Sequence, residues 1–172
     1  MFIWWGPRFA GPGTILVGLR ERRTEIAATL VELPTVAAVA PAILSECGAD
    51  DVVVDEGDIT VAPSIGRYDL AILKAVVQVL PPDQARSSIL NAARCLTAGG
   101  VIAIAGSGVV DDDRLCSPEG VFLNLTFLNL FRHGESYAEG QYRAWMTEAG
   151  FQDISRLRLA DGCTLFRARL AR

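Results

Sequence analysis

A glycine-rich turn and a later carboxylate form the pattern with the clearest chemical potential in this sequence. Gly11 and Gly13 precede an apolar, helix-like run, and Glu32 ends the β-like run that follows it. Glycines at the start of a helix let backbone N–H groups approach a ligand, and an acid at the end of the next strand can hold two ribose hydroxyls. The pattern indicates a nucleotide-binding half-unit, although an ordinary Gly/Pro surface turn explains the glycines alone equally well.

Other polar groups fit a metal or nucleophilic site less well. Asp111, Asp112 and Asp113 are consecutive, so their carboxylates point in different directions and favour a solvated loop over a metal cluster. The 4 cysteines are scattered without a Cys-x-x-Cys pair, and the 1 histidine is His133. We therefore expect no metal site, and reduced thiols in a cytoplasmic protein.

Length and composition limit the kinds of protein this chain can be. With 172 residues, 51% of them hydrophobic, it can build one domain with a substantial core. The net charge of −4 at pH 7 and the pI of about 5.0 argue against nucleic acid as a partner. No apolar run reaches the roughly 20 residues of a membrane span. The apolar start, residues 1–5, lacks the basic segment and cleavage site of a signal peptide. We expect a single domain over residues 1–172, without a membrane segment.

Strand-like and helix-like runs alternate along the chain, and this order predicts the fold. Repeated β-α units build a mostly parallel sheet with helices on both faces. The last two strands flank Asp161-Gly162, a tight-turn signal, so they should form an antiparallel hairpin. Such a hairpin is typical of the Rossmann-like sheet of class I methyltransferases, whereas nicotinamide-binding sheets continue with parallel crossovers. The expected strands lie within 2–10 and at 25–31, 51–54, 68–73, 101–105, 154–159 and 164–170, and the expected helices at 14–23, 34–47, 82–98, 117–131 and 139–149.

Three features describe how individual helices should begin or pack. Ser117 before Pro118 predicts an N-cap followed by proline at the first helical position. The pattern Ser136-x-x-Glu139 predicts a capping box. Residues 121–131 are apolar on nearly all sides, so that helix should be buried or should roof a pocket.

Seven segments in sequence order resemble the catalytic domain of the S-adenosylmethionine-dependent O-methyltransferases of the plant caffeate/hydroxyindole type and their bacterial relatives. The resemblance runs from about Phe9 to the C-terminus. It implies a class I methyltransferase fold and methylation of a small, aromatic or polyketide-like hydroxyl compound. The matching segments are 10–14 (Ala-Gly-Pro-Gly-Thr), 32–34 (Glu-Leu-Pro), 57–59 (Gly-Asp-Ile), 68–74, 96–100 with the strand after them, Glu135, and 148–151 (Glu-Ala-Gly-Phe).

The resemblance also implies residue roles around S-adenosylmethionine. A methyl sulfonium is already electrophilic, so the protein mainly has to hold donor and acceptor in line. The implied cofactor contacts are Gly11 and Gly13 at the methionine end, Glu32 at the ribose, Asp58 and Ile59 at the adenine, and Lys74 nearby.

The sequence departs from the resembled family at the catalytic base. Members carry a histidine after the fourth strand, flanked by two acids. Here Gln78 takes the histidine position, Gly106 falls at or next to the first acid, and Glu135 retains the second. Because a glutamine cannot take a proton near pH 7, the chain methylates an already acidic acceptor, works by proximity alone, or does not methylate. His133, two residues from Glu135, is a candidate replacement base, with a solvent-facing loop histidine as the alternative.

The apolar helix expected at residues 117–131 is where we expect contacts with the acceptor and with a partner chain. Asn124, Phe127 and Asn129 lie where the resembled family contacts its acceptor, although hydrogen bonding between helices explains the asparagines equally well. Members usually carry a helical N-terminal dimerisation domain, which this sequence lacks. We therefore expect apolar surface around residues 121–131 and a homodimer or a partner chain that covers it.

Two other functions compete with methyl transfer. The first is a binding protein that keeps the fold without turnover, which Gln78 and Gly106 favour. The second is a nicotinamide-dependent oxidoreductase, which would require residues 154–170 to form a parallel crossover instead of a hairpin.

Overall fold

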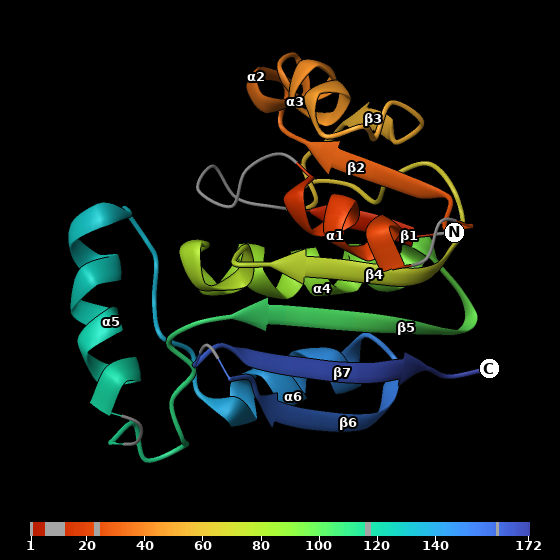
Figure 1. Cartoon of the computed structure of the whole chain (residues 1–172). Coiled ribbons are helices and arrows are strands. Elements are labelled where there is room, and N and C mark those ends of the chain that lie inside the picture. The colour runs from red at the N-terminus through yellow and green to blue at the C-terminus, as the bar shows by residue number, and fades with distance from the viewer. Residues whose placement is uncertain (1, 6–12, 23–24, 116–117, 161) are drawn as a thin grey trace.

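The chain folds around one seven-stranded sheet with the strand order β3-β2-β1-β4-β5-β7-β6 (Figure 1). The computed structural model describes residues 2–5, 13–22, 25–115, 118–160 and 162–172. The strands are β1 (Phe2–Trp5), β2 (Ala28–Glu32), β3 (Val53–Glu56), β4 (Tyr68–Lys74), β5 (Leu96–Gly106), β6 (Phe151–Arg158) and β7 (Thr164–Leu170).

Strand β1 occupies the centre of the parallel part of the sheet. Its residue Trp4 is in register with Leu30 of β2 on one side and with Ile72 of β4 on the other. Strand β7 alone runs against its neighbours, β5 and β6. The hairpin expected from Asp161-Gly162 is therefore confirmed, and the parallel crossover that an oxidoreductase would need is not present.

The helices are α1 (Thr14–Arg22), α2 (Pro34–Ala37), α3 (Ala40–Glu46), α4 (Pro82–Cys95), α5 (Pro118–Leu130) and α6 (Glu139–Glu148), with a 3-10 turn η1 (Val77–Val79). The expectation of one helix over 34–47 is wrong, because it divides into α2 and α3. Pro41 explains the break, since its ring lacks an N–H and crowds the carbonyl of Ala37 four residues earlier. None of the described helices is long and apolar enough to cross a bilayer.

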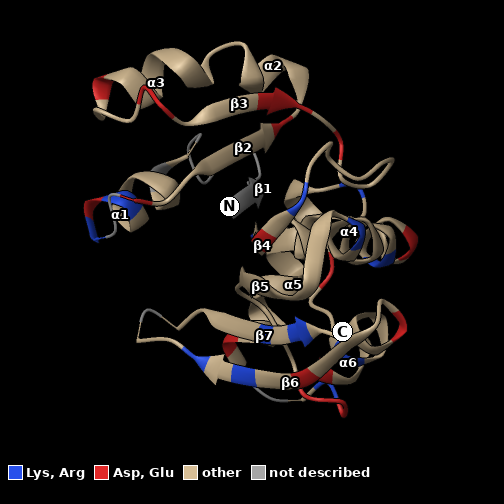
Figure 2. Cartoon of the chain, turned by 90° about the vertical axis from the view of Figure 1, so that its right-hand side faces the viewer, with Lys and Arg blue, Asp and Glu red and all other residues tan. Residues whose placement is uncertain are grey.

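The strands alternate their side chains between two cores, one on each face of the sheet. On one face, Leu30 of β2 and Ile72 of β4 pack with Leu16 of α1 and Leu44 of α3. On the other face, β-strand side chains pack against α4 and α6. Figure 2 shows α1 on one side of the sheet and α4 and α6 on the other, the two-faced covering expected from the β-α repeats.

The expected starts of two strands are corrected. Strand β5 begins at Leu96 and not at residue 101: after the pair Tyr68 and Leu96, the register resumes at Leu70 and Val101, so the residues between form a bulge. Strand β6 begins at Phe151, three residues earlier than expected, and is irregular around Asp153, whose φ is +54°.

The expected capping box at Ser136 and Glu139 is also wrong. The N-cap residue of α6 is Ala138, and Gln141 Oε1 accepts a hydrogen bond from the Ala138 N–H at 3.0 Å. Ser136 is buried and its hydroxyl donates to the carbonyl of Gly120 at 2.9 Å. A serine with a partner in α5 is therefore not available to cap α6. The expected N-cap Ser117 lies outside the described residues.

Candidate active site

The carboxyl end of β2 carries the first group of the candidate site. Glu32 is the last residue of β2 and is only 4% exposed. Its backbone carbonyl accepts a hydrogen bond from the Gly57 N–H at 3.0 Å. A Cβ at residue 57 would lie 2.9 Å from Val31 Cγ1, so only a glycine allows the loop after β3 to lie this close to β2. The structure thus brings Glu32 and the 57–59 loop together.

Asp58 and Ile59 hold this loop in one conformation. Asp58 Oδ1 accepts hydrogen bonds from the Thr60 N–H at 2.9 Å and from its hydroxyl at 2.7 Å. Ile59 is buried, and its carbonyl accepts a hydrogen bond from the amide nitrogen of Asn91 on α4 at 2.8 Å. Asn91 was not predicted, because it belongs to a helix far along the chain and no local pattern indicates its contact.

The structure shows a packing role for Gly13. It has a φ of +83°, and a Cβ there would lie 2.7 Å from Leu44 Cδ2. A side chain would push α1 away from α3, so this position needs a glycine for both conformation and space. The other predicted glycine, Gly11, lies outside the described residues.

The chain turns sharply after Lys74, at the carboxyl end of β4. Lys74 is half-buried, and the next residue, Ala75, has a φ of +53°. The Ala75 N–H donates to the Ala105 carbonyl of β5 at 2.7 Å, which holds the turn against the sheet. Left-handed backbone costs a non-glycine residue about 1–2 kcal/mol, so surrounding contacts must maintain this turn. It directs the chain into η1, and an alanine gave no sequence signal for it.

Gln78 of η1 lies over the end of β5. The residue is 6% exposed, and a Cβ at Gly106 would lie 2.5 Å from the Gln78 side-chain oxygen. The Gln78 carbonyl accepts a hydrogen bond from the Glu135 N–H at 3.0 Å. The three positions singled out in the sequence, 78, 106 and 135, therefore meet in the folded chain.

Tyr137 fixes the segment after α5 against η1. Its buried hydroxyl donates to the Leu80 carbonyl at 2.6 Å. Burial, followed by the charges of Glu135 and Asp83, raises the pKa of Tyr137 well above its ordinary value of 10.0, so it remains a phenol at neutral pH. It acts here as a hydrogen-bond donor that positions the backbone.

The carboxylate of Glu135 has a cationic partner that the sequence did not indicate. Arg114 Nη1 lies 2.7 Å from Glu135 Oε1, and Arg114 Nη2 donates to the side-chain oxygen of Gln141 at 3.0 Å. Arg114 follows the acidic loop and comes from a different part of the chain, so only the fold reveals this pair. His133 is exposed on the loop before Glu135.

Helix α5 stands beyond the carboxyl ends of β4 and β5 (Figure 1). Phe127 is buried, and a Cβ at Gly108 would lie 2.9 Å from its ring. Asn124 accepts a hydrogen bond from the Ser136 N–H at 2.9 Å, which ties α5 to the segment after it. Asn129 is exposed and donates to the Leu125 carbonyl one turn earlier at 2.8 Å. Of the three predicted acceptor residues, Phe127 and Asn124 face the fold and Asn129 lies on its surface.

Helix α5 was expected to be buried or to roof a pocket, and the first alternative is wrong for most of its surface. Phe122 is 71% exposed and Leu128 is 65% exposed, and Val121, Leu125 and Leu130 are exposed as well. The exposed apolar surface expected around residues 121–131 is therefore present.

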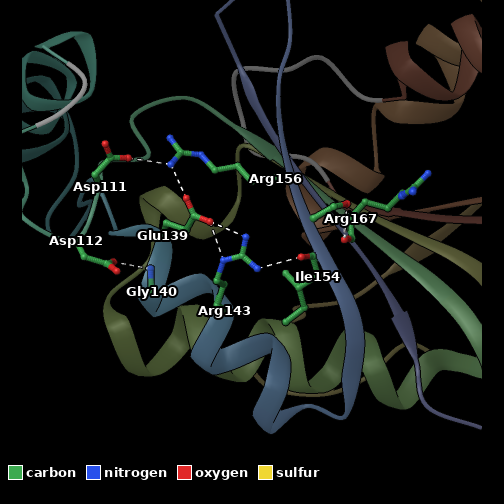
Figure 3. Close-up of polar contacts among 9 residues, drawn as sticks. Asp111, Asp112, Glu139, Gly140, Arg143, Ile154, Arg156 and Arg167 are labelled. Atoms are coloured by element: carbon green, nitrogen blue, oxygen red, sulfur yellow. Dashed lines mark hydrogen bonds and ion pairs between the residues drawn. The ribbon is translucent and has the colours of Figure 1, made fainter.

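Hydrogen bonds and ion pairs join the acidic loop after β5 to α6 and β6 (Figure 3). Arg156 of β6 donates to Asp111 at 3.0 Å and to Glu139 at 2.6 Å. Asp112 accepts a hydrogen bond from the Gly140 N–H in the first turn of α6 at 2.7 Å. Among the described residues no group of three or more His, Cys, Asp and Glu side chains could hold a metal ion.

Strand order and site geometry together define a class I methyltransferase fold. An O-methyltransferase domain model matches residues 10–152, so the chain belongs to that family.

Relatives of this chain are consistent with the family. It is 23% identical over 152 residues to the 3-hydroxy-5-methyl-1-naphthoate 3-O-methyltransferase of Streptomyces sahachiroi, covering 88% of this chain and 44% of that protein. The solved structure of PigF with SAH superimposes with a TM-score of 0.85 at 23% identity, over 98% of this chain and 49% of that one. Human N-acetylserotonin methyltransferase in complex with SAM gives a TM-score of 0.82 at 19% identity, over 99% of this chain and 48% of that one. The chain thus spans about half the length of these relatives.

Proposed function

We propose that this chain is an S-adenosylmethionine-dependent O-methyltransferase domain that acts on a small aromatic or polyketide-like hydroxyl compound. The observation that carries the proposal is the buried Glu32 carboxylate at the end of β2, with the loop of Gly57, Asp58 and Ile59 hydrogen-bonded to the same residue. Membership of the O-methyltransferase domain family supports it.

The residues present fit the cofactor. A carboxylate at the carboxyl edge of a parallel sheet can accept hydrogen bonds from both ribose hydroxyls. Ile59 and the loop beside it would lie against an adenine ring, and Asp58 can accept from its amino group. Gly11 and Gly13 precede α1 and would hold the methionine end, with Lys74 nearby. When bound, the cofactor supplies an electrophilic methyl group on sulfur, and the protein holds the acceptor in line with it.

The acceptor would lie between η1, the segment after α5 and Phe127. Gln78 and Glu135 would face it, and His133 is the remaining candidate for a proton acceptor. The naphthoate methyltransferase of Streptomyces sahachiroi supports an aromatic hydroxyl compound as the acceptor class.

Calorimetric titration with S-adenosylhomocysteine, in parallel with NADH, tests the cofactor. We expect micromolar binding of the sulfur nucleotide alone, weakened at least tenfold in Glu32→Ala. The matched control is Glu56→Ala, because Glu56 is in register with Glu32 on the neighbouring strand and is exposed. No binding of either nucleotide by a folded sample would refute the proposal.

A second function is favoured by Gln78, which takes the position of the family's base histidine. The domain would then bind the cofactor without turnover. Cofactor-dependent methylation that Glu135→Ala abolishes would exclude this alternative.

We further propose that the exposed face of α5 is covered by a second copy or by another chain, because apolar side chains of this size are rarely left in water as a group. Cys47, Cys95 and Cys163 are not in disulfides, which supports a reducing compartment such as the cytoplasm.

A further inference from the structure

The strands β5 and β7 are covered by helices on one face of the sheet only. Figure 1 shows α4 and α6 behind the sheet and α1 in front of its parallel part, and no described helix lies in front of β5 and β7. Sheets built from β-α units normally carry helices on both faces. This part of the sheet therefore has a face that the described residues leave uncovered.

A hollow of about 650 Å³ lies on this uncovered face. The side chains that line it, which we call the β5–β7 face, include Leu70, Val101, Ala103, Leu165, Arg167 and Arg169. Its apolar residues are only half-buried, whereas Ile102 and Phe166, which alternate with them, are fully buried in the core on the other side. Leu70 and Ala103 also pack against the core that contains Leu16 of α1. The β5–β7 face is thus an uncovered continuation of that core.

Arginines on β7 give this face its positive charge. Arg167 and Arg169 are exposed, and neither forms an ion pair with another residue of the described ranges. Figure 3 shows Arg167 turned away from the charged network of α6. Arg169 donates to the Gly99 carbonyl at 2.7 Å, a neutral partner that leaves its charge uncompensated. The acids that line the same hollow, Asp69 and Asp153, are on the outer strands β4 and β6.

The position and width of the β5–β7 face fit an α-helix better than a small ligand. Ligand sites of α/β sheets lie beyond the carboxyl ends of the strands, whereas Leu70 is near the amino end of β4 and pairs with Val101. Neighbouring strands are about 4.8 Å apart and a helix with its side chains is about 10–12 Å wide, so one helix spans about three strands. A helix over β4 and β5 would therefore reach the arginines of β7 with one flank.

We propose that the β5–β7 face binds an acidic amphipathic helix of a partner chain. The apolar side of that helix packs over Leu70, Val101 and Ala103, and carboxylates on its flank pair with Arg167 and Arg169. Burial of apolar area supplies the affinity, and the charge pairs determine which helix binds. This surface is separate from α5 and from the candidate active site, so the inference does not depend on methyl transfer.

Two peptides of opposite charge test this proposal. Both are fluorescein-labelled, are about 18 residues long and share one leucine stripe at helical spacing, with either glutamates or lysines beside the stripe. Fluorescence anisotropy measures their affinity for the full chain. We expect the glutamate peptide to bind about tenfold more tightly than the lysine peptide, and the double variant Arg167→Glu, Arg169→Glu to reverse this preference.

The matched control is Arg132→Glu, which reverses an exposed arginine outside the hollow and should leave the preference unchanged. Because Arg169 also holds the Gly99 carbonyl, Arg167→Glu alone is the second test. It should weaken binding of the glutamate peptide about threefold. Circular dichroism establishes that each variant is folded.

A photo-reactive group on the leucine stripe then locates the bound peptide, and we expect cross-links to β4, β5 or β7. Cross-links to α5, equal affinity for the two peptides, an unchanged preference in the double variant, or no binding by the folded chain would overturn the inference. Sedimentation velocity distinguishes a second copy as the occupant. Loss of self-association in the double variant would assign the β5–β7 face to another copy of this chain and overturn the partner helix.

Discussion

Gly57 and Gly106 matter to the candidate site because their missing side chains leave room for neighbouring residues. Gly57 lets the loop after β3 lie against β2, where its N–H bonds to the Glu32 carbonyl. Gly106 admits the amide of Gln78 over the end of β5. In both cases a side chain far from the glycine in sequence occupies the space that a Cβ would need. Each glycine therefore acts together with one partner residue.

We predict that Gly57→Ala weakens S-adenosylhomocysteine binding about tenfold. The added Cβ would lie 2.9 Å from Val31 Cγ1, and relieving that contact must move the loop away from Glu32. Calorimetric titration measures the affinity. Gly18→Ala is the matched control: nothing lies within 4 Å of its added Cβ, and alanine in a helix should raise stability by about 0.5–1 kcal/mol with no change in affinity. Equal affinity in Gly57→Ala and the unmodified chain would contradict this role.

At the scale of elements, charged groups join α6 to β6 and, through Arg156, to the acidic loop. Glu139 accepts from Arg143 one turn along α6 at 2.7 Å and from Arg156 of β6 at 2.6 Å (Figure 3). Arg143 also donates to the Ile154 carbonyl at 2.9 Å. These contacts fix the helix relative to the sheet edge and to the acidic loop that leads to Arg114.

The Glu139 network predicts a pH dependence of stability. The hydrogen bond from Arg156, aided by Arg143 and opposed by burial, lowers the pKa of Glu139 below its ordinary value of 4.5. A lowered folded-state pKa gives stability that is fully present above the unfolded value and is lost as pH falls through the folded value. Glu139→Gln should therefore lower the Tm at pH 7, and the difference should shrink as pH falls below about 4.5. Thermal melts across pH measure this.

The control for that series is Glu46→Gln, which neutralises an exposed carboxylate at the end of α3. We expect its Tm difference to be small at every pH. A Glu139→Gln difference that stayed constant from pH 7 to 3 would show that the network acts through packing and not through charge.

The order of elements could be predicted from the sequence because its signals are local. The pair Asp161-Gly162 marked the hairpin, and strand ends marked Glu32 and Lys74. The contacts that complete the site are not local. Arg114 reaches Glu135 from a separate loop, and Leu44 explains Gly13 only after α1 and α3 pack together. The break between α2 and α3 could have been predicted from the sequence, because Pro41 marks it.

At the scale of the whole molecule, charge is mixed and one apolar face is open. Figure 2 marks acidic residues at the ends of β2 and β3 and basic residues along β6 and β7. Phe122, Leu125 and Leu128 are exposed on α5. Because water is excluded when such side chains meet another apolar surface, α5 is prone to association.

We predict that the isolated chain associates through α5. Sedimentation velocity over a range of concentrations should show a concentration-dependent increase in mass, reduced in the double variant Phe122→Glu, Leu125→Glu. The control is Val61→Glu, Ile65→Glu, which changes two exposed apolar residues outside α5. Association that is equally strong in the α5 variant would place the contact elsewhere.

The position of β7 determines when the fold can be completed. This strand follows the other described strands in sequence, yet it lies between β5 and β6, with Ala103 opposite Arg167 and Arg156 opposite Phe166. Strand β6 reaches the rest of the sheet only through β7. During synthesis, β6 can therefore join the sheet only after residues 164–170 have been made. Pairing of β5 with β7 also joins distant parts of the chain, which slows folding. Strand β7 thus completes the sheet by inserting between β5 and β6. A chain interrupted before Thr164 would expose β6 to proteolysis.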